Sequence, residues 1–478
     1  MVRLLNMHVP MPVIFLAILD VTIVYFSIAG GLALSYAPNS VLFSFFADGY
    51  ALQKIVFVSI TLMSLFVVGI YSRPFLTDMK MGLVAIIVGH FIALAVLSIA
   101  FYLYQDVRIW IRALVPGLAL SLVGVFVVHL VFDRIIGTRI FKRNLLVIGT
   151  GPLARNVAEV AERSPYLTCI GFLPLSNAKI TVPDTQVLEN TRTLIELARH
   201  HKVDEIVVAV EERRNRLETE QLLECRLNGI QVSEPSSFFE RQEGRVEVDG
   251  LYPSWMIFGP GFNSVTTEQR IAKRLFDVLT SSLLLVFFLP LMILIVLTIG
   301  AGGGGPILYR QDRVGLNGRI FTIWKFRSMR PEAESDGVAR WSSSNDARVT
   351  FLGRLLRRFR MDELPQIWNV LKGDMSFIGP RPERPEFVRQ LEAQIPYYAY
   401  RHIVKPGISG WAQINLPYGA SFKDAKEKLN YDLYYIKNYS LALDFLVLLQ
   451  TARVIVWPTK STRVITAPLV EPQRLRER

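Results

Sequence analysis

Four apolar runs open the chain, and each is long enough to cross a membrane as a helix. They occupy residues 10–36, 51–71, 82–104 and 109–132. A helix of roughly 20 apolar residues spans about 30 Å of hydrocarbon. The alternative, four buried helices of a soluble core, is the less favoured interpretation. The pattern predicts four transmembrane helices packed as a bundle over residues 1–135.

Basic residues flank these runs unevenly, and this predicts their orientation. Arg73 and Lys80 separate the second and third runs, whereas the first connection, residues 37–49, contains no basic residue. After the fourth run come Arg134, Arg139, Lys142 and Arg143. The positive-inside rule places both ends of the bundle in the cytoplasm, although Arg108 and Arg112 on the other side weaken the asymmetry.

Past the bundle the pattern changes to short apolar runs separated by helical stretches. Strands are predicted over residues 145–148, 168–172 and 206–210, and the turn 149–154 has the form GxGxxA. This turn is typical of a nucleotide-binding βαβ unit in a Rossmann-like fold. The 168–172 strand does not end on an acidic residue placed to hold a ribose. A structural or regulatory role and nucleotide binding both remain open for an α/β module over residues 140–255.

A fifth apolar run, residues 283–297, is interrupted by Pro290 and ends at four glycines, residues 302–305. It follows a linker, residues 256–270, and opens a last domain, residues 271–478. Proline removes a helical hydrogen bond and kinks or breaks the helix.

Topology decides how this run sits in the membrane. A complete crossing would place the arginine-rich segment 310–384 outside the cell, away from cytoplasmic nucleotides. We therefore expect a re-entrant helix at about 275–300, broken at Pro290, with both ends in the cytoplasm. Lys273 and Arg274 at its entry are expected to bind lipid phosphates.

The densest cluster of candidate chemistry lies between residues 352 and 385. Its first part alternates at helical spacing between an apolar face and a basic face, which is typical of a helix in a membrane interface. The apolar face comprises Leu352, Leu355, Leu356 and Phe359, and the basic face comprises Arg354, Arg357, Arg358 and Arg360.

Asp362 and Glu363 follow at once, and Pro365 suits the first turn of a second helix. Backbone N–H groups at such a junction are expected to keep Asp362 ionised. The segment 379–385, GPRPERP, holds arginines on a stiff backbone. Taken singly, the acidic pair fits a helix cap and GPRPERP a rigid turn. Together they suggest phosphate chemistry at a membrane surface.

Composition supports a membrane protein that binds anions. The chain is 51% hydrophobic with a formal net charge of +12, and its mean hydropathy is +0.33. Arginines beside apolar stretches favour lipid over nucleic acid as the partner. Cys169 and Cys225 are the two cysteines, and the six histidines are scattered, so a disulfide framework or a cysteine-based zinc site is not expected.

Several motifs then occur in a fixed order over about residues 271–457. They resemble those of the bacterial sugar transferases, monotopic polyprenyl-phosphate hexose-1-phosphate transferases that initiate exopolysaccharide and capsule synthesis. The motifs are KRLFD, YRQDRVG, WKFRSM, MDELPQIWNVLKGDMSFIGPRPE, KPGISGWAQI and YDLYYIKN. The N-terminal half is similar to that of the large members, most like the subgroup associated with exopolysaccharide export.

The resemblance implies a two-step transfer. Asp362 would be the nucleophile that attacks the sugar-bearing phosphate of a UDP-sugar, UDP-glucose or UDP-galactose, and UMP would leave. The covalent phosphosugar would then pass to undecaprenyl phosphate. Glu363 would orient the site or, with Asp362, bind Mg²⁺.

The resemblance also assigns basic residues to the substrates. Arg381 would clamp the phosphate, helped by Lys325 and Arg327, and Arg401 and Lys405 would face the nucleotide or the lipid phosphate. His402 is expected to be structural, and the polar loop 330–345 is a candidate lid. The large members imply a multi-pass protein of the bacterial inner membrane, a cytoplasmic catalytic domain and a homodimer.

Two rival functions remain open. A membrane-bound nucleotide-sugar dehydratase would need a tyrosine and a lysine four residues apart in the α/β module, and residues 144–253 contain no such pair. A non-catalytic scaffold of polysaccharide assembly would have a decayed site. Asp362, Glu363 and Arg381 are all present, which favours the enzyme.

Overall fold

The computed structural model describes most of the chain. The described residues are 2–4, 7–36, 50–71, 79–136, 142–174, 181–183, 186–188, 193–210, 219–249, 251, 253–258, 261–262, 265–302, 305–329, 348–416 and 421–456. The candidate lid, the first connection, Arg73 and Arg139 lie outside these residues, so the predictions that concern them stay untested.

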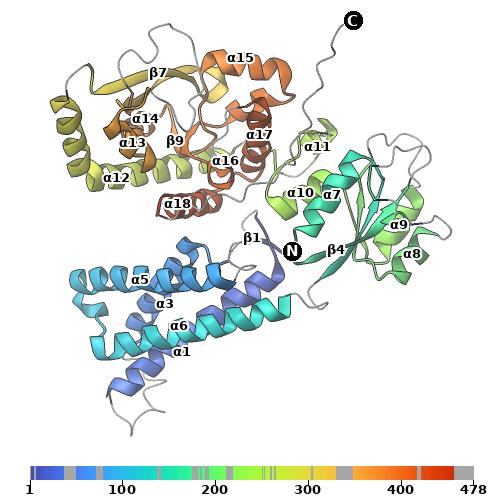
Figure 1. Ribbon diagram of the computed structural model, residues 1–478, viewed down its shortest axis with the longest axis horizontal. Coiled ribbons are helices and arrows are strands. Elements are labelled where there is room, and N and C mark those ends of the chain that lie inside the picture. The colour runs from blue at the N-terminus through green and yellow to red at the C-terminus, as the bar shows by residue number, and fades with distance from the viewer. Residues whose placement is uncertain are drawn as a thin grey trace, which may run out of the picture.

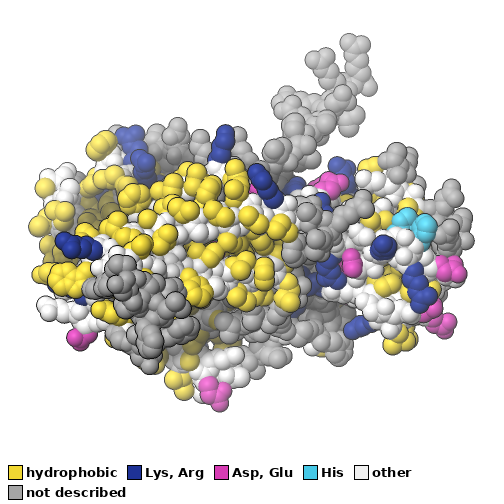
Figure 2. All heavy atoms as spheres, turned by 90° about the horizontal axis from the view of Figure 1, so that it is seen from below, with side chains coloured by type: hydrophobic (Ala, Val, Ile, Leu, Met, Phe, Trp, Pro, Cys, Tyr) yellow, Lys and Arg dark blue, Asp and Glu magenta, His cyan; other side chains and the backbone are white. Residues whose placement is uncertain are grey.

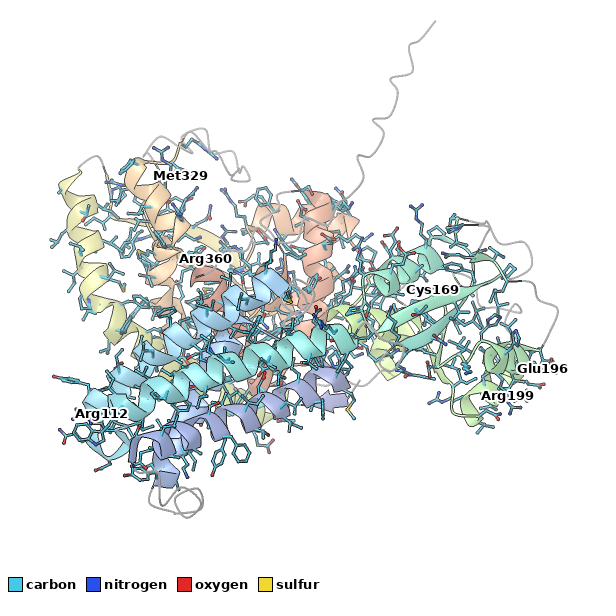
Figure 3. The ribbon with its side chains drawn as sticks, turned by 60° about the horizontal axis from the view of Figure 1, so that its bottom comes forward. Arg112, Cys169, Glu196, Arg199, Met329 and Arg360 are labelled. Atoms are coloured by element: carbon cyan, nitrogen blue, oxygen red, sulfur yellow. The ribbon has the colours of Figure 1, made fainter. Side chains whose placement is uncertain are left out.

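Four long apolar helices occupy the four predicted runs. They are α1 (Met11–Tyr36), α3 (Ala51–Val68), α5 (Met79–Leu103) and α6 (Ile111–Ile136), and each is long and apolar enough to cross a membrane. Before them lies a short antiparallel pair, β1 (Val2–Leu4) and β2 (Met7–Val9). The N-terminus and the end of α6 lie at one end of the helices, beside the α/β module, and Arg112 lies at the opposite end (Figures 1 and 3).

Small residues let α1 and α6 approach closely. A Cβ built on Gly31 would lie 2.5 Å from the Ala113 carbonyl oxygen and 2.8 Å from the Gly117 nitrogen. Close backbone approach at small residues is how membrane helices commonly pack. The outward faces of these helices carry mostly apolar side chains, whereas charged side chains gather over the α/β module (Figure 2). This surface suits a hydrocarbon environment.

The α/β module is a four-stranded parallel sheet in the order β4-β3-β5-β6. Its strands are β3 (Arg143–Ile148), β4 (Leu167–Leu173), β5 (Glu205–Val208) and β6 (Gln231–Ser233). The helices α7 (Pro152–Glu162) and α10 (Pro235–Glu243) pack with one set of core residues, and α8 (Leu194–His200) and α9 (Thr219–Leu227) with another. The predicted α/β fold is thus present.

The turn after β3 requires glycine. Gly149 has φ of +117°, and a Cβ there would lie 2.4 Å from the Ala209 carbonyl oxygen. Only glycine adopts this conformation freely at such a close approach.

The α/β module is tied to the last domain by the segment 244–251. Val246, Val248 and Leu251 are buried in the core of the last domain. The Val246 N–H donates to the Asn430 carbonyl at 2.9 Å, and the Trp411 Nε1–H donates to the Gly244 carbonyl at 2.7 Å. After α11 (Pro253–Phe258), the chain reaches the next long helix.

That helix, α12 (Thr267–Ala301), is 35 residues long and continuous through Pro290. The sequence predicted a break at Pro290, but the helix is not interrupted there. The helix instead changes direction along its length (Figure 1). Proline commonly produces such bends. Both ends of α12 contact the same domain: Lys273 donates to the Ile378 carbonyl, and Ile295 and Ile299 pack against Phe326 and Leu356.

The last domain is mainly helical. A β-hairpin, β7 (Leu308–Val314) and β8 (Ile320–Phe326), precedes α13 (Phe351–Arg358), the 3₁₀-helix η6 (Met361–Gln366) and α14 (Ile367–Lys372). Strands β9 (Ser376–Ile378) and β10 (Gly407–Ser409) pair in parallel. The remaining elements are α15 (Pro385–Gln394), η7 (Tyr398–Ile403), α16 (Trp411–Asn415), α17 (Phe422–Lys437) and α18 (Leu441–Val456).

Candidate active site

The acidic pair lies where the sequence predicted, between two helices. The helix α13 ends at Arg358, Arg360 adopts a left-handed conformation with φ of +55°, and η6 then carries Asp362 and Glu363 into α14. Arg360 is labelled in Figure 3, at the end of α13. A Cβ on Gly353 would lie 1.9 Å from the Ser328 carbonyl oxygen, so α13 is seated tightly beside the chain that follows β8.

Glu363 is the fixed carboxylate of the site. It is 7% exposed, and its Oε1 accepts from Lys325 Nζ at 2.9 Å and from Arg381 Nη2 at 2.6 Å. Burial alone would raise the pKa of Glu363, but the charges of Arg381 and Lys325 outweigh it and hold the pKa below its usual range. Glu363 is therefore ionised at neutral pH and orders both cations.

Asp362 lies in a different electrostatic environment. It is also 7% exposed, and burial and then the charge of Glu363 raise its pKa, against the opposing charges of Lys325, Arg357 and Arg381. The sequence led us to expect that a helix N-terminus keeps Asp362 ionised; the raised pKa makes the ionised Asp362 more basic than an ordinary aspartate. The neighbouring carboxylates are thus distinct: one is held by two cations, and the other is a more basic group.

The hairpin delivers Lys325 but not Arg327 to this carboxylate. Lys325 is in β8 opposite Tyr309, with its ammonium on Glu363. Arg327 follows the strand and donates from Nη2 to the Ile299 carbonyl at 3.3 Å, at the end of α12. Arg327 therefore helps to fasten α12 to the hairpin.

Arg401 holds the main chain of Arg381 in place. Arg401 is 4% exposed, and its Nη2 donates to the Arg381 carbonyl at 2.8 Å and to Asp432 Oδ2 at 2.9 Å. Its Nη1 donates to the Tyr398 hydroxyl at 2.6 Å. The structure thus places Arg401 inside the domain, where it orients the Arg381 loop, rather than at an open surface. Burial and the adjacent Arg401 lower the pKa of His402 to about 4, so this histidine is neutral.

Lys273 and Arg274 also lie differently from the lipid-facing positions that the sequence predicted. Lys273 is 6% exposed and pairs with Asp444 at 2.8 Å. Arg274 donates to the carbonyls of Val370 and Leu371, both at 2.6 Å, at the end of α14. Both side chains anchor α12 to the domain, because they bind partners far away in the sequence. The sequence alone did not reveal these partners.

Lys405 lies near Arg274 and not among the cations around Glu363. A Cβ on Gly373 would lie 3.7 Å from Lys405 Nζ and 3.8 Å from Arg274 Nη2. Burial and then the charge of Arg274 lower the pKa of Lys405. The predicted basic residues therefore separate into two groups, Lys325 and Arg381 at the acidic pair, and Lys405 with Arg274 at the end of α14.

Sequence reasoning did not assign several charged residues near Arg381. Arg313 of β7 donates to the Pro382 carbonyl at 3.2 Å and lies 3.7 Å from Glu383. Lys428 of α17 has Glu383 and Arg381 as its main charged neighbours. Arg313 stands in the YRQDRVG motif, which was the available signal.

The acidic pair fits a Mg²⁺ ion that also binds substrate phosphates. Among the described residues there is no group of three or more metal-binding His, Cys, Asp or Glu side chains. Mg²⁺ is usually held by one or two carboxylates together with substrate phosphates, so such a group is not required. A cation beside Asp362 would offset both its burial and the charge of Glu363, which are the causes that raise its pKa.

Known proteins resemble the part of the chain that carries this site. The family model described as bacterial sugar transferase matches residues 268–458. This match contains every predicted site residue. A glucose-1-phosphate transferase of Klebsiella pneumoniae, named for UDP-glucose and undecaprenyl phosphate, is 32% identical over 65% of this chain and 67% of its own length.

The chain belongs to the bacterial sugar transferase family.

Further relatives bear names of the same kind. An Aeromonas hydrophila protein named UDP-N-acetylgalactosamine-undecaprenyl-phosphate N-acetylgalactosaminephosphotransferase is 43% identical over 49% of this chain and 54% of its own length. The Escherichia coli (strain K12) UDP-glucose:undecaprenyl-phosphate glucose-1-phosphate transferase is 33% identical over 55% of this chain and 56% of its own length. The matches thus span about half of these two relatives.

Proposed function

We propose that this bacterial sugar transferase moves hexose-1-phosphate from a UDP-sugar to undecaprenyl phosphate and releases UMP. The observation that carries the proposal is the unequal acidic pair: Asp362 is a buried carboxylate with a raised pKa, and it adjoins Glu363, which is held by Lys325 and Arg381. A nucleophile benefits from basicity, and phosphate binding benefits from ordered cations. The names of the relatives supply the substrate class.

In the first step the ionised Asp362 attacks the sugar-bearing phosphorus. A bond forms between a carboxylate oxygen and phosphorus, the bond from phosphorus to the bridging oxygen breaks, and its electron pair leaves on UMP. Lys325 and Arg381 neutralise charge on the transferred phosphate, and Glu363 keeps both cations aimed at it.

In the second step a phosphate oxygen of undecaprenyl phosphate attacks the same phosphorus. The bond between phosphorus and the Asp362 oxygen breaks, which restores the carboxylate and yields undecaprenyl-diphospho-hexose. Since the two substrates react in turn, one site serves a soluble donor and a lipid acceptor.

Mg²⁺ belongs to this proposal, with Asp362 and Glu363 as the residues that would hold it. When bound, it supplies neutralisation of the charges on the two phosphates of the donor. The residues themselves still bind, orient and attack as described.

The site works at a membrane surface in this proposal. Both ends of α12 contact one domain, which supports a re-entrant helix in the inner membrane with the catalytic domain in the cytoplasm. Phe351 is 85% exposed, Trp368 63% and Leu355 50%, and such side chains suit the lipid interface. A homodimer is part of the same proposal, with the α/β module as its candidate interface.

The test incubates the purified protein with Mg²⁺, undecaprenyl phosphate and a panel of UDP-sugars, and records nucleotide and lipid products. UDP-glucose and UDP-galactose are the first donors to try, and UDP-N-acetylgalactosamine joins the panel because of the Aeromonas relative. UMP release with lipid product is expected. Release of UDP would overturn the mechanism, and a folded but inactive protein would favour the scaffold.

The nucleophile has its own test. Asp362→Asn keeps the size of the side chain but removes the nucleophilic oxygen charge, so UMP release should fall at least about 10³-fold, or about 4 kcal/mol. Unchanged product formation in this variant would contradict the assignment.

A further inference from the structure

A second group of cations lies beside the loop that carries Arg381. In the antiparallel hairpin Tyr309 pairs with Lys325 and Arg313 pairs with Phe321. Directly paired and alternate residues share one face of a hairpin, so Arg313 and Lys325 lie on the same face. Lys325 contacts Glu363 there, whereas Arg313 contacts the Arg381 loop.

Arg313 is oriented by its neighbours and keeps an unused donor. Its Nη1 donates to the Pro382 carbonyl at 3.2 Å, and its Nη2 donates to Gln311 Oε1 at 2.5 Å. The loop is also tied to the strand, because the Val314 N–H donates to the Glu383 carbonyl at 3.0 Å. Arg313 Nε is buried and has no hydrogen-bond partner among the described residues.

Lys428 belongs to α17, and its charged neighbours include Glu383 and Arg381 of the same loop. It lies one helical turn before Asp432, which binds Arg401, and Arg401 in turn holds the Arg381 carbonyl. Burial, together with the charges of Arg381 and Arg401, lowers the pKa of Lys428.

Several cations thus lie close together at this loop. Burial and the like charges of Arg381 and Arg384 lower the pKa of Arg313 to about 10, against the opposing charge of Glu383. Glu383 opposes the charge of Arg313, whereas Arg381 and Arg384 repel it, and Glu383 and Asp424 oppose the charge of Lys428, whereas Arg381 and Arg401 repel it. A bound anion would offset the repulsion among these cations.

Resting on the proposed function, we propose that Arg313 and Lys428 form the subsite for the second phosphate, the one that the departing nucleoside monophosphate retains. In a diphosphate the second phosphate adjoins the first. Arg381 likewise adjoins both Lys325, at Glu363, and the second group of cations, Arg313 and Lys428. When the bond from phosphorus to the bridging oxygen breaks, the electron pair stays on that oxygen. Arg313 and Lys428 then stabilise the added charge without a proton transfer.

The same subsite receives the lipid phosphate in the second step. The acceptor must attack phosphorus opposite the Asp362 oxygen, which is the position that the nucleoside monophosphate has just left. One pair of cations therefore serves first as a leaving-group site and then as an acceptor site.

The test compares full-length wild type with Arg313→Gln, Lys428→Gln and the double variant, all in nanodiscs. Inhibition by UMP and by uridine is measured for each. Because uridine lacks the phosphate, the subsite predicts that the UMP inhibition constant rises about tenfold or more in each single variant, while that of uridine stays within about twofold. A merely structural role would change both constants together.

Two control variants separate loss of the subsite from other effects of substitution. Arg313→Lys retains the charge and should recover most of the UMP inhibition. Arg389→Gln changes an exposed arginine of α15 and should behave as wild type. If the melting temperature shows that Arg313→Gln is misfolded, Lys428→Gln alone provides the test. Equal UMP inhibition in Lys428→Gln and wild type would overturn the proposal.

Failure of the proposed function would appear differently. The wild type would then release UDP or no nucleotide. Failure of the subsite alone would leave UMP release by the wild type intact while the variants kept their UMP inhibition.

Discussion

At the residue scale, the site depends on how the carboxylate of Glu363 changes the pKa of Asp362. Glu363 raises the pKa of Asp362, and it also holds Lys325 and Arg381, whose charges would otherwise lower that pKa more strongly. The attack requires Asp362 to be ionised. Activity should therefore be lost as the pH falls through the pKa of Asp362, which burial and Glu363 raise from the ordinary value of an aspartate and which a bound Mg²⁺ would lower again.

Glu363→Gln should move this acidic limb to lower pH. The variant removes the adjacent negative charge and frees two cations to act on Asp362, so both changes lower the pKa of Asp362. The maximal rate should fall about 10-fold to 100-fold, since the cations lose their ordering partner. The pH profile of UMP release at saturating donor measures the shift. Glu386→Gln, on an exposed residue of α15, is the control. A limb that stays in place or moves to higher pH would contradict this account.

The pair of Arg401 and Asp432 makes a separate prediction about stability. Both side chains are nearly inaccessible, at 4% and 2% exposure. Arg401→Met would strand the buried Asp432 and should destabilise the domain by about 3–5 kcal/mol. Thermal unfolding followed by near-UV circular dichroism measures this loss. The double variant with Asp432→Leu removes both charges and should recover much of it. Equal losses in the two variants would show that the ion pair is not the cause.

These contacts mark the limit of prediction at the residue scale. The sequence brought Asp362, Glu363, Lys325 and Arg381 forward as a set, and the structure places all four together. The sequence did not distinguish a buried arginine from an exposed one. The partner of Arg401 lies 31 residues later, and the partner of Lys273 lies on α18. Such pairs depend on tertiary packing that local patterns do not contain.

At the element scale, hydrophobic runs predicted the long helices well, because a run of that length has few other stable forms in lipid. The prediction for α12 was wrong in one respect: the helix continues through Pro290. A proline removes one hydrogen bond and bends a helix, and whether the helix ends there depends on its contacts on both sides. Here the two ends of α12 are fastened by Lys273 and Arg327.

Seating of α13 should control the acidic pair that follows it. Gly353→Ala would place a Cβ 1.9 Å from the Ser328 carbonyl oxygen, so α13 would have to move away from the chain after β8. Since Asp362 lies nine residues later, the rate of UMP release should fall at least about tenfold. Gly300→Ala is the matched control, because its Cβ would lie 4.0 Å from the nearest atom, Ile307 Cδ1. Similar activities in the two variants would refute a role for this close approach.

At the scale of the whole molecule, composition and motif order indicated a membrane region, an α/β module and a transferase domain, and the described residues contain elements for each. The boundary between the last two is where the structure adds most. Residues 244–251 follow α10 directly, yet Val246, Val248 and Leu251 lie in the core of the transferase domain. A short apolar segment carries no periodic signal that would reveal which core receives it.

This arrangement predicts how the transferase domain can be cut from the chain. A fragment that starts at residue 234 keeps α10 and the segment 244–251, whereas a fragment that starts at residue 263 exposes the surface that Val246, Val248 and Leu251 cover. Each buried side chain of this kind contributes about 1.5–3 kcal/mol, so the shorter fragment should lose several kcal/mol of stability. Asn430 would also lose its hydrogen bonds to the main chain of Val246 and Val248. Melting temperatures and UMP release of the two fragments in nanodiscs measure the difference. Equal melting temperatures would mean that the segment adds nothing to the domain. A lower melting temperature and weaker UMP release in the shorter fragment would show that the transferase domain begins inside the region that follows α10.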